Sequence, residues 1–473
     1  MNDKLSNAMD YIDDSKIAAA AAAKRTRKPV FFRAIAAVLA LVVFLNLPIF
    51  SVPASASEIA TASQYREIPL PDQGSYDTFE EFRAAMDGYE AAMGQRQRDA
   101  LCAYAQLKPF FIKSGSAYAG SSTENRVWSP INAYIALAML SEVTEGDSRK
   151  QIMEALAVSD LDTLRTQVSA VWEELYTNRE GNEICTLANS LWLNKGLTFN
   201  QQTMDSLAYH HYASVFQQDL SSEEGMEALQ AWLSNNTGGL LDDQLGNIHL
   251  PQETVLALAS TVYLKAKWGD EFQSSMNTTS PFHTPAGDVS ATFMNKKEMQ
   301  THYYWGDDFG AVSLWLKNDC KMWFLLPDED KTVQDILSYG QYLDILTPGN
   351  GEPENAKYMK VNLSVPKFDV FSSADLSGIL QQMGITDVFD FNKSDFSAIA
   401  GDVPVTVTQI NQAARVVIDE QGVEAGSYIE ISGAGAARPP EEIIDFILDR
   451  PFVFVIADSQ TGLPLFTGVV NKP

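Results

Sequence analysis

Histidine and cysteine side chains carry out much of the chemistry of enzymes and metal sites, and this chain has few of them. It contains five histidines and three cysteines, spread widely along 473 residues (His210, His211, His249, His283, His302, Cys102, Cys185 and Cys320). No histidine lies in a pattern typical of a base beside a nucleophile, and no G-x-S-x-G, H-E-x-x-H or P-loop motif occurs. The cysteines are odd in number and include no C-x-x-C pair. The sequence therefore favours a protein that is not an enzyme and that holds no metal or cofactor.

Residues 420–440, near the C-terminus, combine two patterns that conflict. From Val423 to Ile431 small or apolar residues alternate with the residues Glu424, Gly426, Tyr428 and Glu430, as in a half-buried strand. From Ser432 to Pro440 the chain is Gly, Ala and a Pro pair, which is typical of an exposed loop. Two interpretations fit: an edge strand followed by a linker, or a segment that is a loop in one state and a strand in another.

The composition indicates a large globular protein with an acidic surface. Hydrophobic residues make up 45% and charged residues 20% of the chain, as in ordinary soluble domains. The net charge of -27 argues against a nucleic-acid partner and against a heparin-like cofactor, because both are polyanions.

The N-terminus predicts a targeting segment. A basic region around Lys24 to Arg33 precedes the apolar run Ala34 to Leu45, and Ala54-Ser55-Ala56 provides an A-x-A cleavage site. The run is shorter than the roughly 20 residues that a spanning helix needs. Two outcomes stay open: secretion with cleavage after Ala56, or a membrane anchor formed by residues 34–50. Both place the bulk of the chain outside the cell, with the membrane contacted only through this segment.

The remaining chain predicts one N-terminal extension and one large α+β domain. Residues 57–75 are expected to form a solvated linker, residues 76–107 a helix packed on the main domain, and residues 114–125 a loop. Helices and strands then mix without βαβ alternation, which favours antiparallel-rich sheets. The expected helices are 131–142, 147–157, 202–212, 224–241 and 376–383, and the expected strands are 182–192, 255–268, 311–316, 321–326, 361–370, 452–456 and 465–470. The domains are therefore assigned as 1–56, 57–100 and 101–473.

Seven motifs follow one another along residues 100–473. They are Asn125-Arg-Val-Trp-Ser-Pro130, Ala188-Asn-Ser-Leu-Trp192, Trp232-Leu-Ser-Asn-Asn-Thr-Gly-Gly239, Thr261-Val-Tyr-Leu-Lys-Ala-Lys-Trp268, Val365-Pro-Lys-Phe368, Arg450-Pro-Phe-Val-Phe454 and Pro464-Leu-Phe-Thr-Gly468. In type and order they resemble the motifs of the serpin family, and the resemblance is to a bacterial-type member, secreted or anchored at the surface. It implies an α+β serpin fold with three β-sheets, eight or nine helices and an exposed reactive-centre loop.

The resemblance places residues 420–440 on that loop and implies a protease inhibitor. The family's hinge matches Glu420-Gln-Gly-Val-Glu-Ala-Gly-Ser427, so the hinge residues are Glu420, Gly422, Val423, Glu424, Ala425, Gly426 and Ser427. In inhibitory members a serine protease cleaves the loop and is trapped as an acyl-enzyme when the upstream half inserts into a sheet as a strand. On insertion Val423, Ala425 and Ser427 would face inward, where their small side chains fit a packed interior.

The expected scissile bond follows from counting along the family's loop. The seventeenth residue from Glu420 is Ala436, with Ala437 after the break. Small neighbours on the upstream side suit an elastase-like protease. A trypsin-like protease is less favoured, because Arg438 precedes Pro439 and a proline after the scissile residue generally blocks serine proteases.

Two further groups of residues are implied by the resemblance. The shutter, where the sheet parts, corresponds to Ser129, Asn132, Ser260 and Gln412, the last three of which depart from the family's usual Ser, Asn and His. The breach, where the loop begins to insert, corresponds to Trp268 and an ion pair between Lys367 and Glu420. A monomer is expected. The alternative function is a non-inhibitory extracellular serpin that acts as a binding protein or as a protease substrate.

Overall fold

The computed structural model describes eight stretches of the chain, which are 57–64, 68–119, 123–179, 183–246, 254–347, 354–408, 410–423 and 440–473. Of the two compact units, Met1–Ser51 and Val52–Pro473, the described residues all belong to the second. The expected targeting segment, residues 1–56, therefore lies outside the described residues, as do residues 424–439.

Three sheets organise the strands. One has the order β1-β5-β4-β6-β14 with β3 beside β4, the second has the order β15-β11-β8-β9-β10-β16-β17-β2 with β7 beside β8, and the third is the pair β12-β13. The strands are β1 Ser57–Ala60, β2 Arg126–Trp128, β3 Thr177–Arg179, β4 Glu183–Asn194, β5 Ala213–Gln218, β6 Leu256–Lys267, β7 Thr278–Thr284, β8 Gly287–Trp305, β9 Phe309–Trp315, β10 Cys320–Pro327, β11 Ala356–Pro366, β12 Phe368–Asp375, β13 Asn411–Ile418, β14 Gly422–Val423, β15 Ile443–Ile447, β16 Phe452–Asp458 and β17 Pro464–Val470.

The helices carry clear capping signals. Ser129 caps α5 by accepting a hydrogen bond from Asn132 N, and Pro130 occupies the first helical position. Asp160 caps α7 and Ser222 caps α9 in the same way. The helices are α4 Phe79–Ala119, α5 Pro130–Val143, α6 Gly146–Leu156, α7 Leu161–Leu175, α8 Gln201–His210, α9 Glu223–Asn236, α10 Asp242–Leu245, α11 Val333–Tyr339, α12 Tyr342–Leu346, α13 Ser377–Gln382 and α14 Ser397–Ala400.

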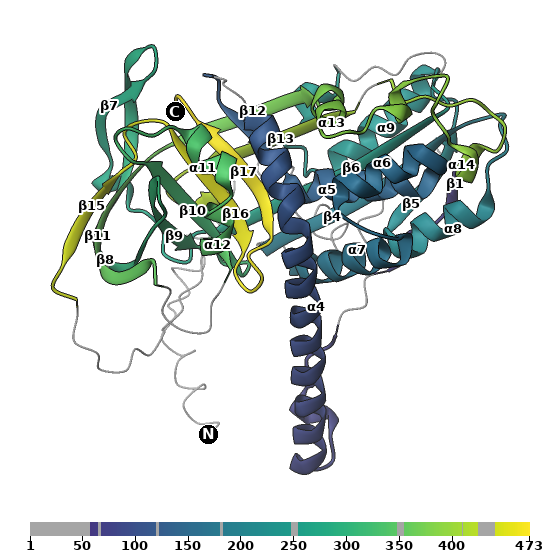
Figure 1. Cartoon of the computed structure of the whole chain (residues 1–473). Helices are drawn as coiled ribbons and strands as arrows, with labels where there is room; N and C mark the ends of the chain where they lie inside the picture. Colours follow the sequence, from purple (N-terminus) through teal and green to yellow (C-terminus); the bar gives the residue numbers. More distant parts are fainter. Residues whose placement is uncertain are drawn as a thin grey trace, which may run out of the picture. The chain divides into compact units, whose positions relative to one another are not determined.

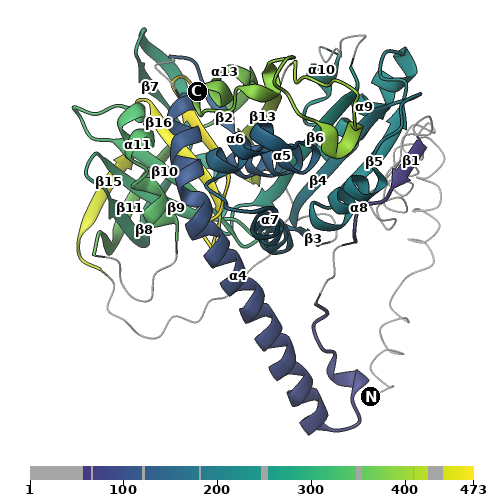
Figure 2. The same cartoon turned by 45° about the vertical axis from the view of Figure 1, so that its right-hand side comes forward.

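The core lies between the sheets and the helices α4 to α8 (Figure 1). Every residue of β16 and β17 is buried, which explains why these strands are continuous apolar runs without alternation. The helix α5 is buried along most of its length and packs against β6 and β17 (Figure 2). A second, smaller hydrophobic cluster is formed around Trp192, Phe216 and Trp232. It packs α9 against the six-stranded sheet, on the face opposite the main core.

The expected α+β class with three sheets is confirmed, and three boundaries were wrong. Residues 57–60 are not linker, because β1 pairs antiparallel with β5. The helix α4 continues through Pro109 to Ala119, so the first six residues of the expected loop 114–125 are helical. The expected strand 361–370 is two strands, β11 and β12, separated at Lys367.

None of the helices in the part of the chain that the structure describes is long and apolar enough to cross a bilayer. The expected anchor, residues 34–50, lies outside that part.

Candidate functional site

The candidate site is the space between β6 and β13, two strands that face one another without pairing. On its other side β6 forms an antiparallel ladder with β4, and β13 forms one with β12. Among the described strands, β6 pairs on the site's side only with the two residues of β14, and β13 pairs with none. Two strand edges therefore present backbone N–H and C=O groups toward a common space, as the edge strands of a sheet do.

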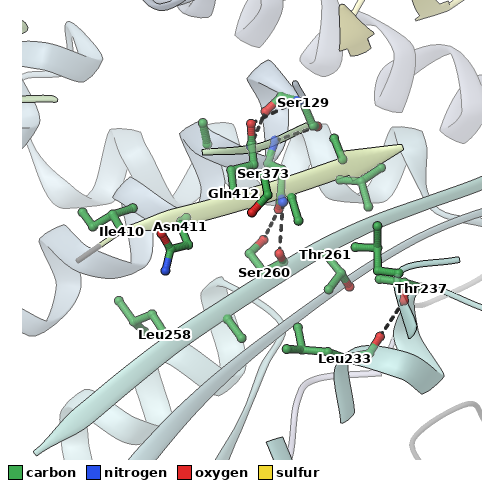
Figure 3. Close-up of a pocket in the computed structure, with 18 of the residues that line it drawn as sticks. Ser129, Leu233, Thr237, Leu258, Ser260, Thr261, Ser373, Ile410, Asn411 and Gln412 are labelled. Carbon is green, nitrogen blue, oxygen red and sulfur yellow. Dashed lines mark hydrogen bonds between the residues drawn. The ribbon is translucent and has the colours of Figure 1, made fainter. Parts of the chain in front are cut away.

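A cavity of about 1290 Å³ occupies this space. Figure 3 shows β13, in pale green, and β6, in teal, on opposite sides of it, with Gln412 on β13 and Ser260 on β6. Its walls are mostly aliphatic side chains of β6 and β13, and helices α5 and α9 close it from the two faces of the sheet (Leu258, Val262, Val416, Ala133, Leu137, Leu229 and Leu233 among them). The cavity thus combines apolar walls with unpaired strand edges.

Ser129 and Gln412 join β13 to the start of α5 at the base of this cavity. The side-chain amide of Gln412 donates to Ser129 O over 3.0 Å, and its oxygen accepts from Ser129 N over 3.4 Å. Both residues are buried, with 7% of Gln412 and 2% of Ser129 exposed. Because the amide pairs with both backbone groups of one residue, it fixes β13 against the cap of α5.

Asn132 and Ser260 make the matching connection on the other strand. Asn132 Nδ2 donates to Ser260 O over 3.0 Å, and the Ser260 hydroxyl contacts Asn132 Oδ1. The same hydroxyl lies 2.7 Å from Asn189 Oδ1, and the Asn189 amide donates to the carbonyl of His211 over 2.7 Å. Asn189 of β4, which is 3% exposed, is therefore a member of this group that the sequence prediction missed. Its place in the motif Ala188-Asn-Ser-Leu-Trp192 was the available signal.

Arg415 of β13 reaches across to the segment between α9 and α10. Its Nη1 donates to Leu240 O over 3.4 Å, and its Nη2 pairs with Asp369 of β12 over 2.7 Å. Hydrogen bonding to Asp369 is the main reason that the pKa of Arg415 is raised. This contact links the two-stranded sheet to the helical layer that covers the cavity.

The expected hinge begins at the end of the cavity nearest Trp268. Gly422 pairs with Lys267, and Val423 with Ala266, so β14 has started an antiparallel ladder along β6. The indole of Trp268, which is 1% exposed, donates to Asp419 O over 2.8 Å, and its backbone N–H donates to Gln421 O over 3.3 Å. Trp268 thus holds the chain that leads from β13 into β14.

Lys367 and Glu420 form the expected ion pair at this end. The ammonium lies 2.5 Å from Glu420 Oε1, and Asn277 Nδ2 donates to the same oxygen over 2.5 Å. Burial raises the pKa of Glu420, but the hydrogen bonds from Lys367 and Asn277 outweigh it, so its pKa lies below the usual value. The carboxylate is only 15% exposed, so the pair is less open to solvent than a surface ion pair.

Four of the predicted site residues line this cavity. Ser129, Asn132, Ser260 and Gln412 meet at its base, and Trp268, Lys367 and Glu420 meet at the end where β14 begins. The hinge residues Glu424, Ala425, Gly426 and Ser427 and the expected scissile residues Ala436 and Ala437 lie outside the described residues. None of the described side chains form a cluster of three or more metal-binding groups.

Comparison with known proteins finds one family along most of the chain. The family described as "Serpin (serine protease inhibitor)" matches residues 112–473. An alpha-1-antitrypsin-like protein, GS55-MS, of Ictidomys tridecemlineatus is 28% identical over 361 residues, covering 75% of this chain and 84% of that protein. Alpha-1-antitrypsin of Meriones unguiculatus is 27% identical over 362 residues, covering 75% and 86%.

Solved structures share the fold at lower identity. The crystal structure of a thermophilic serpin, tengpin, in the native state gives a TM-score of 0.70 at 23% identity, covering 89% of this chain and 100% of that one. Human glycosylated kallistatin gives a TM-score of 0.67 at 24% identity, covering 79% and 99%.

Proposed function

The chain belongs to the serpin family, described as serine protease inhibitors, and from this we propose that it is a suicide-substrate inhibitor of serine proteases. The protease serine attacks the carbonyl carbon of Ala436, forming an ester, and the peptide bond to Ala437 breaks as its amine leaves with a proton. The upstream half of the loop then enters the sheet between β6 and β13 as a strand. The protease, still esterified to Ala436, is carried along with it.

One observation supports this mechanism more than any other: β14 already occupies the space between β6 and β13 at one end. The remainder of that space is bordered by two strand edges and apolar walls, which suit an added strand. Each residue that enters can pair its backbone with both edges, and each such hydrogen bond contributes about 1 kcal/mol net.

The pairing of β14 also supports the assignment of inward residues. If the ladder continues in register from Val423 opposite Ala266, Ala425 lies opposite Leu264 and Ser427 lies opposite Val262. Residues that face each other across an antiparallel pair have their side chains on the same face of the sheet. Ala266 and Leu264 are 0% and 5% exposed and belong to the main core. Inserted residues with odd numbers would therefore enter the core.

The preferred target is an elastase-like protease, because the residues before the expected break, Gly433 to Ala436, are small. We assign the inhibitory domain to residues 101–473 and residues 57–100 to an N-terminal extension. We place the protein outside the cell, released by cleavage after Ala56 or anchored by residues 34–50.

The test is to mix the full-length protein with pancreatic elastase and separate the products on a denaturing gel. An inhibitor gives a covalent complex whose size is close to the sum of the two proteins, and mass spectrometry of the released C-terminal peptide locates the break at Ala436–Ala437. A protease inactivated by replacing its active-site serine with alanine is the control and gives no covalent complex.

Cleavage without a complex would contradict inhibition. It would leave the alternative in which the protein is a substrate or a binding protein.

A further inference from the structure

The N-terminal half of α4 extends away from the three sheets, as Figure 1 and Figure 2 both show. Its start is set by a capping box, in which Thr78 N donates to Glu81 Oε2 over 3.0 Å and Glu81 N donates to Thr78 Oγ1 over 3.2 Å. No residue from 68 to 99 is buried, and the first buried residue of α4 is Ala100. Most helices in proteins are stabilised by packing of an apolar face, so about six turns without such packing indicate a contact with another molecule.

The large apolar residues of this half are spaced alternately three and four residues apart. They are Phe79, Phe82, Met86, Tyr89 and Met93, which we call the seam. A narrow stripe with this seven-residue repeat is typical of a helix that pairs with another helix. The same repeat continues to Leu107 and Phe110, which are buried in the main core. The seam therefore lies on the face of α4 that the core covers further along the helix.

The residues that precede α4 cover the seam only in part. The ring of Tyr76 lies 6.0 Å from that of Phe82. Phe79 nevertheless is 68% exposed, and Leu70, in the segment that leads to the helix, is 65% exposed. The other four seam residues are also partly exposed. Within the described part of the chain, no element buries the seam.

The seam is complementary to itself when two copies of α4 run antiparallel. If Met86 of one copy lies opposite Tyr89 of the second copy, the repeat places Phe82 opposite Met93. Each layer then joins an aromatic ring to a methionine, whose sulfur makes favourable contacts with rings. A two-fold axis repeats every contact, as in the self-matching interface of a symmetric dimer.

Charged residues beside the seam match in the same register. Arg83 and Glu90 flank the seam on one side, and the antiparallel pair places Arg83 of each copy next to Glu90 of the other. Both side chains are exposed, and neither forms an ion pair within the described part of its own chain. The residues on the other side are Ala85 and Ala92, which let the helices approach closely. A parallel pair would instead place Ala85 beside Glu90 and leave the charges unmatched.

A membrane surface fits the seam less well than a second copy does. Residues 79–93 contain four acidic residues and one basic residue, so their net charge is -3. Helices that bind anionic lipids are rich in Lys and Arg on their polar face. The charges beside the seam therefore favour a partner that carries the same helix.

We propose that the protein forms an antiparallel dimer through residues 79–93 of α4, with seam against seam. Phe and Tyr side chains bury roughly 150–250 Å² each, so the three aromatic residues of the seam bury less than the roughly 800 Å² per partner of a standard interface. The dimer is therefore weak, with an expected dissociation constant on the order of 10 μM. This differs from the monomer expected from the sequence, and it does not depend on the proposed function.

The experiment is sedimentation velocity of the full-length protein over a range of concentrations, with residues 1–56 common to all variants. Arg83→Glu and Glu90→Arg are each expected to raise the dissociation constant roughly five- to thirtyfold, because two symmetry-related pairs change from attraction to repulsion. The double variant, and an equimolar mixture of the two single variants, should associate within about threefold of the wild type, because opposite charges again face each other. Asp87→Arg makes the same charge change on an exposed residue away from the seam and should stay within twofold.

Cysteine cross-linking tests the orientation of the two helices. In a Cys102→Ser background, which removes an exposed thiol, the variants Phe82→Cys and Met93→Cys should form a disulfide when they are mixed and oxidised. Neither should cross-link to itself, because like positions lie eleven residues apart along the pair, about 16 Å, which is too far for a disulfide. Self-linking of either variant without cross-linking of the mixture would indicate parallel helices and overturn the proposal.

A full-length protein that remains monomeric at about tenfold the expected dissociation constant would overturn the inference, as would a double variant that associates no better than the single ones. So would a Met86→Glu variant with wild-type association, or one that loses only binding to phosphatidylglycerol vesicles, since the seam would then bind lipid. Thermal unfolding verifies that each variant is folded, which we expect because residues 79–99 include no buried side chain.

Discussion

Replacing Ala425 with Arg is expected to convert the protein from an inhibitor into a substrate. If an inserted strand continues the register begun by Gly422 and Val423, position 425 would lie opposite Leu264, which is 5% exposed in the main core. An arginine there would carry a charge into the core without a partner, at a cost of about 3–5 kcal/mol. At about 1.4 kcal/mol per factor of ten, insertion slows by a factor of roughly 10² to several times 10³.

The matched control is Glu424→Arg, which introduces the same side chain one position earlier and on the opposite face. In the same continued register, position 424 would lie opposite Lys265, which is partly exposed. Like charges directly opposite one another on a sheet surface cost about 0.2–1 kcal/mol. This change is therefore expected to slow insertion by less than about tenfold.

The assay is the stoichiometry of inhibition, that is, the number of inhibitor molecules consumed for each elastase molecule trapped. A trapped protease results when insertion is faster than hydrolysis of the acyl-enzyme, so slower insertion raises this number. We expect it to rise at least tenfold more for Ala425→Arg than for Glu424→Arg. Equal effects of the two variants, or a larger effect of Glu424→Arg, would refute the register and the assignment of inward residues.

Three further predictions concern stability and are measured by urea unfolding. Gln412→Ala should lower the free energy of unfolding by about 1–3 kcal/mol, because Ser129 N loses its partner in a buried site, whereas Asn411→Ala at the exposed neighbour should change it less. Glu142→Gln should lower it by about 3–5 kcal/mol at pH 7, because the carboxylate is 4% exposed and binds Arg165 and His211; an equally stable variant would contradict this. Burial raises the pKa of Glu142, but hydrogen bonds from His211, Arg165 and Ser206 lower it by a larger amount. The pKa of Glu142 therefore lies well below its usual range. Its stabilisation should therefore be complete above about pH 5 and decrease as the pH falls below the unfolded pKa of about 4.3, so the difference between wild type and Glu142→Gln should shrink in acid.

Some elements could be predicted from the sequence because local signals agree with the fold. The start of α5 is set by Ser129 and Pro130, which are a cap and a first-turn proline, and the hairpin of β9 and β10 follows from two apolar runs around Asn318-Asp319. Alternation in residues 423–431 likewise predicted a strand, and its first residue is in β14.

Other features depend on tertiary contacts that no local pattern records. Pro109 should interrupt a helix, yet α4 continues through it because one face of residues 103–111 is buried in the core, with Leu107 and Phe111 at 0% exposure. Ser57–Ala60 becomes a strand only because the edge of β5 is available to it. Asn189 joins the base of the cavity through Ser260, a contact between residues far apart in sequence.

The contact between Arg415 and Leu240 bears on the order in which contacts would be released during strand insertion. Along β13, Ile418 lies nearest the hinge, then Arg415, then Gln412. A strand that enters from Val423 would thus meet the ion pair of Glu420 first, the bridge from Arg415 to the α9–α10 segment next, and the hydrogen bonds of Ser129 and Ser260 last. Insertion would then proceed as an ordered series of steps, each released by a different set of side chains, and a substitution at each set would slow or speed its own kinetic phase.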